Sequence, residues 1–247
     1  LTDLCPATAR IAATLIRSVF DENEVAVFEG DVSVATALLD LPFSHIFFTG
    51  STRVGKIVMA AAAKHLASVT LELGGKSPVI VDNGADIEKI AADLAGAKQF
   101  NGGQACISPD YVFIKEDQKT RLVEGFKATV AQNLYDENGQ IKKDSIAQIV
   151  NEANFNRVKA LFDDAVAQGA TVAVGGQMDA TDLTIHPTLL TDVTPQMKIL
   201  QEEIFAPVLP VMTYDTLDQV IGYIEARDKP LALYIYSNDE ANVDKVL

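Results

Sequence analysis

The sequence predicts an α/β fold in two parts, and three observations support this fold class. Short, near-continuous apolar runs such as residues 45–49 are typical of strands buried in a parallel sheet. Stretches with apolar residues at helical spacing alternate with these runs, as in a doubly wound sheet. Glycine pairs at 74–75, 102–103 and 175–176 mark breaks between elements.

The first part alternates helices and strands up to about Leu73. Helices are predicted over residues 2–20, 33–39 and 51–65, and strands over 24–28, 45–49 and 68–73. Pro6 is tolerated in the first helical turn because the amide there has no partner within the helix. Pro42 marks the end of the second helix. Residues 1–73 therefore form one expected unit.

The pattern restarts after Pro78 and continues to the end of the sequence. Strands are predicted over 79–81, 111–115, 171–174, 184–190, 207–212 and 231–237, and helices over 86–97, 117–133, 145–168 and 217–226. Asp86 is a predicted helix cap. Pro187 predicts an edge position for strand 184–190, since proline cannot donate to a ladder. The second expected domain comprises residues 74–247.

Composition narrows the classes of partner. The 247 residues include 20 Lys and Arg against 34 Asp and Glu, a net charge of −14. This charge disfavours nucleic acids and anionic membranes, which bind basic faces. No apolar run approaches the ~20 residues of a membrane span, and no signal peptide is evident. Cys5 and Cys106 form no CxxC pair or Cys/His cluster, so no metal site is predicted, and sparse cysteine is typical of a cytoplasmic protein.

Cys106 lies in a loop of small residues, Asn101-Gly-Gly-Gln-Ala-Cys-Ile-Ser-Pro109. Glycine permits backbone conformations that other residues avoid, so this loop can close tightly around the sulfur. A buried, inert thiol is the alternative, but it leaves the glycines and the proline unexplained. A thiol on a loop after a helix is well placed to act as a nucleophile.

Glu72 is the second candidate, because it stands in the apolar strand 68–73 just before a glycine pair. Loss of water there would favour the protonated carboxyl and bring it toward the working range of a general base. A strand-end glutamate neutralised by Lys76 is the alternative, and the sequence leaves both open.

Residues Gly50 to Lys56 match most of a phosphate-loop pattern, Gly-x-x-x-x-Gly-Lys. Ile57 stands where a hydroxyl should bind magnesium, which argues against an ATP site. A Gly-x-Gly-x-x-Gly fingerprint is absent as well. The helix start at Gly50-Ser51 can still favour an anion, and a plain helix cap is the alternative.

Four motifs, in order, resemble the aldehyde dehydrogenase superfamily. They are Phe48-Thr-Gly-Ser-Thr-Arg-Val-Gly55, Glu72-Leu-Gly-Gly-Lys76, Gly103-Gln-Ala-Cys106 and Glu202-Glu-Ile-Phe-Ala-Pro207. The separation of Glu72 and Cys106, 106 − 72 = 34 residues, is also similar. The stretch from Thr49 to His65 is most similar to class-3-type members, which include coniferyl aldehyde dehydrogenases.

The resemblance implies oxidation of an aldehyde, with an aromatic, coniferyl-type aldehyde as one candidate, to a carboxylic acid. Cys106 would form a thiohemiacetal and then a thioester, and Glu72 would activate the hydrolytic water. NAD or NADP would be the cofactor, with the choice open. The implied cofactor-binding residues are Gly50, Ser51, Val54 and Gly55 at the helix start, Glu203 at the nicotinamide ribose and Phe205 at the ring. Ala206 departs from the family's usual glycine, which bears on the local backbone.

The resemblance also implies which part of a family member this sequence represents. Residues 1–73 would be the C-terminal part of a Rossmann-like NAD-binding domain, and 74–247 a catalytic domain truncated at its C-terminus. We expect both ends of a family member to be missing and the complete protein to form a homodimer. Residues 1–247 alone are expected to bind the cofactor weakly and not to turn over. The alternatives are a CoA-acylating member and a catalytically incompetent fragment that acts only as a binding or structural core.

Overall fold

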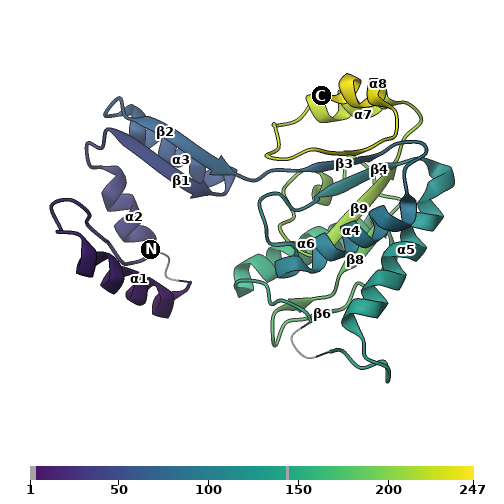
Figure 1. Ribbon diagram of the computed structural model, residues 1–247, viewed down its shortest axis with the longest axis horizontal. Helices are drawn as coiled ribbons and strands as arrows, with labels where there is room; N and C mark the ends of the chain where they lie inside the picture. Colours follow the sequence, from purple (N-terminus) through teal and green to yellow (C-terminus); the bar gives the residue numbers. More distant parts are fainter. Residues whose placement is uncertain (1–3, 143–144) are drawn as a thin grey trace. The chain divides into compact units, whose positions relative to one another are not determined.

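The computed structural model describes residues 4–142 and 145–247, and the chain divides into two compact units, Leu1–Leu73 and Gly74–Leu247 (Figure 1). These limits coincide with the two parts expected from the sequence. The cofactor-binding and catalytic roles of those parts stay predictions.

The first unit combines helices with a two-stranded parallel sheet. Its elements are α1 (Pro6–Val19), α2 (Val32–Leu39), β1 (His45–Gly50), α3 (Thr52–Ala63) and β2 (Ser68–Leu73). In the ladder His45 lies opposite Ser68, and Thr49 lies opposite Glu72. Helix α3 connects the two strands and packs against them (Figure 1). The order strand, helix, strand agrees with the prediction for residues 45–73.

The strand predicted over residues 24–28 is wrong. The amides of Glu24 and Val25 donate to Asp21 O in a turn, and Arg17 Nη2 donates to Val27 O at 3.0 Å. Among the described residues no strand lies alongside to complete a ladder. Apolar composition alone cannot make a strand when its backbone groups bond elsewhere. The predicted helix start at Thr2 lies outside the described residues.

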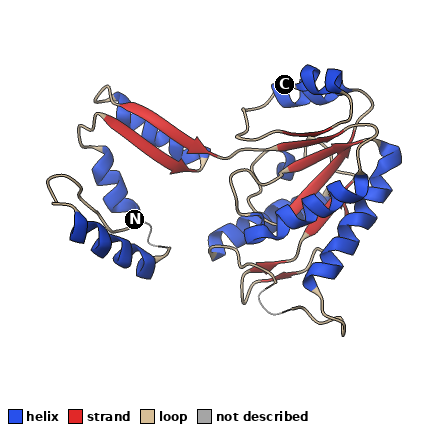
Figure 2. Cartoon of the chain, in the orientation of Figure 1, coloured by secondary structure: helices blue, strands red, loops and turns tan. Residues whose placement is uncertain are grey.

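The second unit is built on a six-stranded sheet with the order β10-β3-β4-β9-β8-β5 (Figure 2). The strands are β3 (Pro78–Val81), β4 (Tyr111–Ile114), β5 (Thr171–Val174), β8 (Thr188–Thr191), β9 (Val208–Thr213) and β10 (Tyr234–Tyr236). The helices are α4 (Ile87–Gln99), α5 (Glu116–Leu134), α6 (Glu152–Ala167), α7 (Leu217–Glu225) and α8 (Glu240–Val246), with short 3-10 turns η1 (Phe100–Gly103) and η2 (Lys198–Leu200). All neighbours are parallel except β5 and β8. A small hairpin joins β6 (Met178–Asp179) to β7 (Thr184–Ile185).

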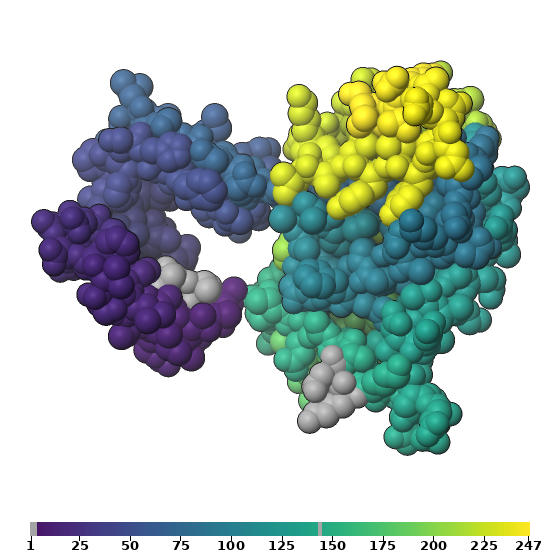
Figure 3. All heavy atoms as spheres, viewed as in Figure 1, coloured from purple at the N-terminus to yellow at the C-terminus, as the bar shows by residue number. Residues whose placement is uncertain are grey.

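Alternate side chains of β4 enter two different cores. Val112 and Ile114 pack in a cluster with apolar residues of α4 and α5. Tyr111 and Phe113 pack in another cluster with residues of α6 and α7. Helices therefore cover both faces of the sheet, which confirms the predicted doubly wound α/β class. The C-terminal segment, yellow in Figure 3, continues the sheet where β10 pairs with β3.

Two details of the second unit differ from the sequence prediction. Strand 184–190 is divided at Pro187 into β7 and β8, and β8 lies inside the sheet. Pro187 precedes the ladder, so its missing N–H interrupts nothing, and Thr188 N donates to Pro207 O at 2.8 Å. The helix predicted from residue 145 begins at Glu152. Gln104 instead bonds the backbone of Gln148 and Val150 and holds that segment irregular.

Candidate functional site

Cys106 lies in the turn that follows α4 and η1. Asn101, Gly102 and Gly103 all adopt left-handed backbone conformations there, with φ of 50°, 62° and 68°. A Cβ at Gly103 would lie 2.5 Å from Ala206 O, so only glycine allows this approach. The thiol of Cys106 is exposed. The prediction of a buried thiol is therefore wrong, and the reactivity of Cys106 stays a prediction.

Gln104 anchors the Cys106 turn on both sides. Its Nε2 donates to Asn101 O and to Gln148 O at 3.0 Å each, and its Oε1 accepts from Val150 N at 2.9 Å. These contacts join the turn to a segment more than forty residues away in sequence. Gln104 belongs to the motif that contains Cys106, but nothing in the sequence marked this anchoring role.

Tyr234 holds the same turn from β10. Its hydroxyl donates to Ile107 O at 2.6 Å, on the residue directly after Cys106. Burial raises the pKa of Tyr234, and the nearby charge of Cys106 raises that pKa further. Tyr234 and the thiol are thus electrostatic neighbours. No sequence signal marked Tyr234, because the contact spans 127 residues.

A buried ion pair holds the loop that carries Glu203 and Phe205. Lys76 Nζ pairs with Asp110 and donates to Ile199 O at 2.8 Å and Glu202 O at 3.0 Å. Asp110 Oδ1 accepts from Ile204 N at 2.9 Å. The three acceptors occupy all the donors of the Lys76 ammonium. The alternative in which Lys76 neutralises Glu72 is therefore wrong.

Glu203 and Phe205 differ from their neighbours in exposure and backbone. Glu202 is exposed, whereas Glu203 is half-buried with its carboxylate over Gly74, where any Cβ would overlap it. Burial raises the pKa of Glu203, and the amide of Gly75 opposes this by donating to the carboxylate. Phe205 has a left-handed φ of 51°. Ala206 does not, so the usual glycine's freedom is not required there.

The four predicted residues at the start of α3 lie together in the first unit. Gly50 ends β1, and Ser51 caps α3 by accepting from Val54 N at 3.4 Å. Gly55 is buried, and a Cβ there would lie 2.8 Å from Leu73 Cδ2. Its small size lets the helix approach β2. The helix-cap alternative is confirmed as geometry, while anion binding at this helix start stays a prediction.

Glu72 does not have the burial expected for it. Its side chain is exposed in β2, with Thr49 opposite in β1. Glu72 belongs to the first unit and Cys106 to the second. Desolvation within its own sheet therefore does not support the proposed role of Glu72 as a base.

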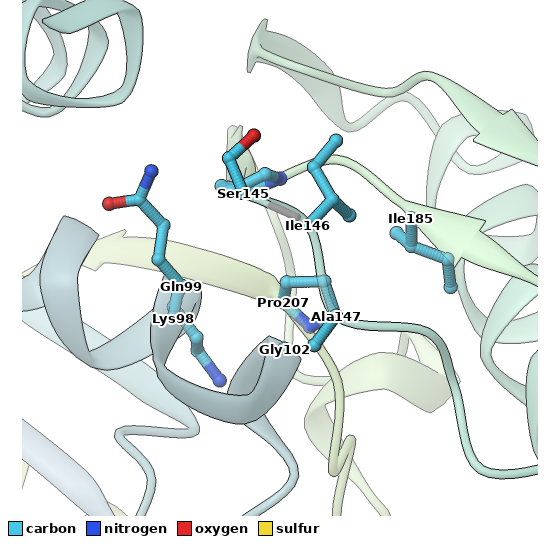
Figure 4. Close-up of a pocket in the computed structure, with 9 residues that line it drawn as sticks. Lys98, Gln99, Gly102, Ser145, Ile146, Ala147, Ile185 and Pro207 are labelled. Carbon is cyan, nitrogen blue, oxygen red and sulfur yellow. The ribbon is translucent and has the colours of Figure 1, made fainter. Parts of the chain in front are cut away.

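A small open pocket lies beside α4 in the second unit, next to Gly102 of the Cys106 turn (Figure 4). Its lining residues are Lys98, Gln99, Gly102, Ser145, Ile146, Ala147, Ile185, Pro187 and Pro207, and its cavity volume is about 10 Å³. Cys106 and Glu203 do not line it, and ligand pockets are commonly about 300–1,000 Å³. This pocket is therefore not the predicted aldehyde site.

No group of three or more His, Cys, Asp or Glu within 4–142 and 145–247 could hold a metal ion. None of the helices described combines the length and apolar character that crossing a membrane requires.

The family model for the aldehyde dehydrogenase family matches residues 2–247. The chain belongs to the aldehyde dehydrogenase family. It is 56% identical over its whole length to AldX of Bacillus subtilis (strain 168), covering 56% of that relative. It is 44% identical over 97% of its length to the "dimeric NADP-preferring" aldehyde dehydrogenase of Rattus norvegicus, covering 51% of it. A probable coniferyl aldehyde dehydrogenase of Caulobacter vibrioides is 43% identical over the whole chain, which covers 51% of it.

A solved structure of an aldehyde dehydrogenase family member agrees with the fold. The substrate-bound AldH of Staphylococcus aureus superposes with a TM-score of 0.90 at 40% identity, covering 99% of this chain and 52% of that one. The predicted fold class and family are confirmed. The chain spans about half the length of the curated relatives named above.

Proposed function

We propose that the whole protein oxidises an aldehyde to a carboxylic acid with NAD or NADP. The observation that carries this proposal is the exposed thiol of Cys106, held on a turn that Gln104 and Gly103 fix in place. Exposure makes the sulfur accessible, and the fixed turn limits the entropy lost when it attacks. Membership of the aldehyde dehydrogenase family supports the same reaction class.

Cys106 is the proposed nucleophile. Its thiolate attacks the aldehyde carbon, a C–S bond forms, and the carbonyl π electrons move to oxygen to give a thiohemiacetal. The Cys106 amide is a candidate donor to that oxyanion, because it makes no backbone hydrogen bond within the described part of the chain. Removing one such donor typically costs about 10²–10³ in rate.

The residues present are compatible with NAD or NADP. The first turn of α3 has no acidic residue, so the positive end of the helix can favour a pyrophosphate. The Glu203 carboxylate, seated over the glycine at Gly74, can accept hydrogen bonds from ribose hydroxyls. A bound nicotinamide would supply the hydride acceptor for the oxidation. Phe205, left-handed and partly exposed, can support a planar ring.

Glu72 is the proposed base for hydrolysis of the thioester. It would take a proton from water as the new C–O bond forms and the C–S bond breaks, which returns the Cys106 thiolate. Transfer of the acyl group to coenzyme A is the second candidate. The carboxylate at Glu72 favours hydrolysis, because transfer to a thiol requires no activated water.

The substrate class and assembly rest on the relatives. The Caulobacter relative's name supports an aromatic, coniferyl-type aldehyde as one candidate substrate. The rat relative's name supports a homodimer. The sparse cysteines support a cytoplasmic location, since reactive thiols persist in a reducing compartment.

Aldehyde-dependent reduction of NAD and NADP by the whole protein tests the proposal. Cys106→Ser should lose nearly all turnover, whereas Cys5→Ser, the matched control, should retain it. With Glu72→Gln we expect an initial burst of reduced cofactor followed by slow steady turnover, because thioester formation would survive and its hydrolysis would not. Normal turnover by Cys106→Ser would overturn the assignment, and product release only with coenzyme A would favour the second candidate.

A further inference from the structure

Lys98 occupies a core position of α4 although it carries an amine. The buried residues of this helix recur at helical spacing, and the others are apolar: Ile87, Ile90, Ala91, Leu94 and Ala95. Lys98 has no exposed surface (0%). A buried lysine is costly unless its amine has partners, so its partners show what it is retained for.

The amine of Lys98 contacts two loops. Nζ donates to Ser108 Oγ at 3.3 Å and to Ala206 O at 3.2 Å. Ser108 follows Cys106 by two residues, and Ala206 directly follows Phe205. Both acceptors are neutral, so among the described residues no carboxylate within hydrogen-bond distance accounts for the burial of this amine. Figure 4 shows Lys98 and Gln99 leaving α4 in opposite directions.

A close backbone contact also joins the same two loops. Gly103 lies against Ala206 O with no room for a Cβ, and Lys98 donates its hydrogen bond to the same oxygen. Burial lowers the pKa of Lys98 to about 8; Asp110 and Glu203 oppose this shift, and Lys76 adds to it. The charged groups that face the amine thus lie in three segments: Lys76 just before β3, Asp110 just before β4, and Glu203 in its own loop.

We propose that Lys98 is a positioning residue that fixes the Cys106 turn relative to the Glu203–Phe205 loop. This inference rests on the proposed function, since it assigns thiol and cofactor to those two loops. Lys98 itself need not touch the substrate. An error of about 1 Å in such an alignment can cost about 10²-fold in rate.

Lys98→Met tests the inference in the whole protein, because it keeps chain length and apolar volume but removes both donated bonds. We expect kcat to fall about 10²-fold, with KM for aldehyde changed less than threefold. Thermal stability should not fall, since replacing a buried charge by an apolar residue is often neutral or stabilising. Lys89→Met, an exposed lysine on the same helix, is the matched control and should leave kcat unchanged.

Ser108→Ala removes one of the two acceptors and completes a double-mutant cycle. If Lys98 acts partly through Ser108, the effects of the two substitutions on kcat should be less than additive. Unchanged kcat in Lys98→Met, within twofold, would overturn the inference. A kcat loss that merely parallels a large loss of folded protein would do so as well.

A second readout needs no enzymatic activity and separates this inference from the proposed function. A fluorinated alkylating reagent attached to Cys106, with Cys5→Ser in the background, reports the turn by its ¹⁹F resonance. We expect one narrow line with Lys98 and a shifted or broadened line in both Lys98→Met and Ser108→Ala. An unchanged line in both variants would overturn the positioning role, whether or not Cys106 proves to be the nucleophile.

Discussion

The two units hold their predicted site residues by different means. In the first unit, the start of α3 is fixed by a cap between Ser51 and Val54, three residues apart, and Glu72 is exposed. In the second unit, Lys76 and Asp110 fix the Glu203 loop through contacts up to 126 residues apart in sequence. Local caps can be recognised in a sequence, whereas buried long-range pairs cannot.

The difference also concerns what each unit loses when a contact is removed. An exposed local contact exchanges easily with water, so its loss costs little. A buried charge that loses its partner keeps its full desolvation penalty. The stability of the second unit should therefore depend far more on single polar residues.

The largest effect should come from the Lys76–Asp110 pair. Its side chains are 10% and 3% exposed, so Asp110→Asn should lower the free energy of unfolding of the second unit by about 3–5 kcal/mol, because a buried ammonium loses its partner. Lys64→Met is the matched control in the first unit, where the Lys64–Asp40 pair is 62% and 68% exposed and worth about 0–1 kcal/mol. Denaturant titration measures both. Equal losses in the two variants would contradict the contrast between the units.

A pH dependence should be the next largest effect, and it belongs to the second unit. Burial lowers the pKa of Lys98 from 10.5 to about 8. Between these values the unfolded chain binds more protons, so stability should rise with pH, by about 2–3 kcal/mol between pH 8 and 10. Above pH 10 the sign reverses, because burial raises the pKa of Tyr214 to about 12 and also raises that of Tyr111. Denaturant titrations at pH 7.5, 8.5 and 9.5 measure the slope.

Lys98→Met is the control for this pH dependence. It removes the titrating amine, so the rise between pH 8 and 10 should largely disappear. A rise of the same size in the variant would assign it to other groups and contradict the burial argument for Lys98.

The sequence predicted most of the elements and the site motifs, and its errors share a cause. Strand 45–50, helix 52–63 and strand 68–73 were found because their apolar pattern and their cap at Ser51 are local. Strand 24–28 and the edge position of 184–190 were wrong because pairing partners decide strands. Gln104 and Tyr234 were missed, since their contacts join segments distant in sequence.

The smallest effect on stability should come from the helix caps, which occur in both units. Ser51 accepts from Val54 N at 3.4 Å in the first unit, and Asp86 accepts from Lys89 N at 3.1 Å in the second. Replacing a cap by alanine costs about 0.5–2 kcal/mol, and we expect Ser51→Ala at the low end because its bond is longer. Asp86→Ala should cost about 1 kcal/mol, since a charged cap also complements the helix dipole.

Amide hydrogen exchange at Val54 and Lys89 measures the two caps separately, each within its own unit. A cost of about 1 kcal/mol corresponds to amide exchange that is roughly fivefold faster, where local opening governs the exchange. Faster exchange at Val54 than at Lys89, relative to each parent amide, would show that bond length does not rank these caps.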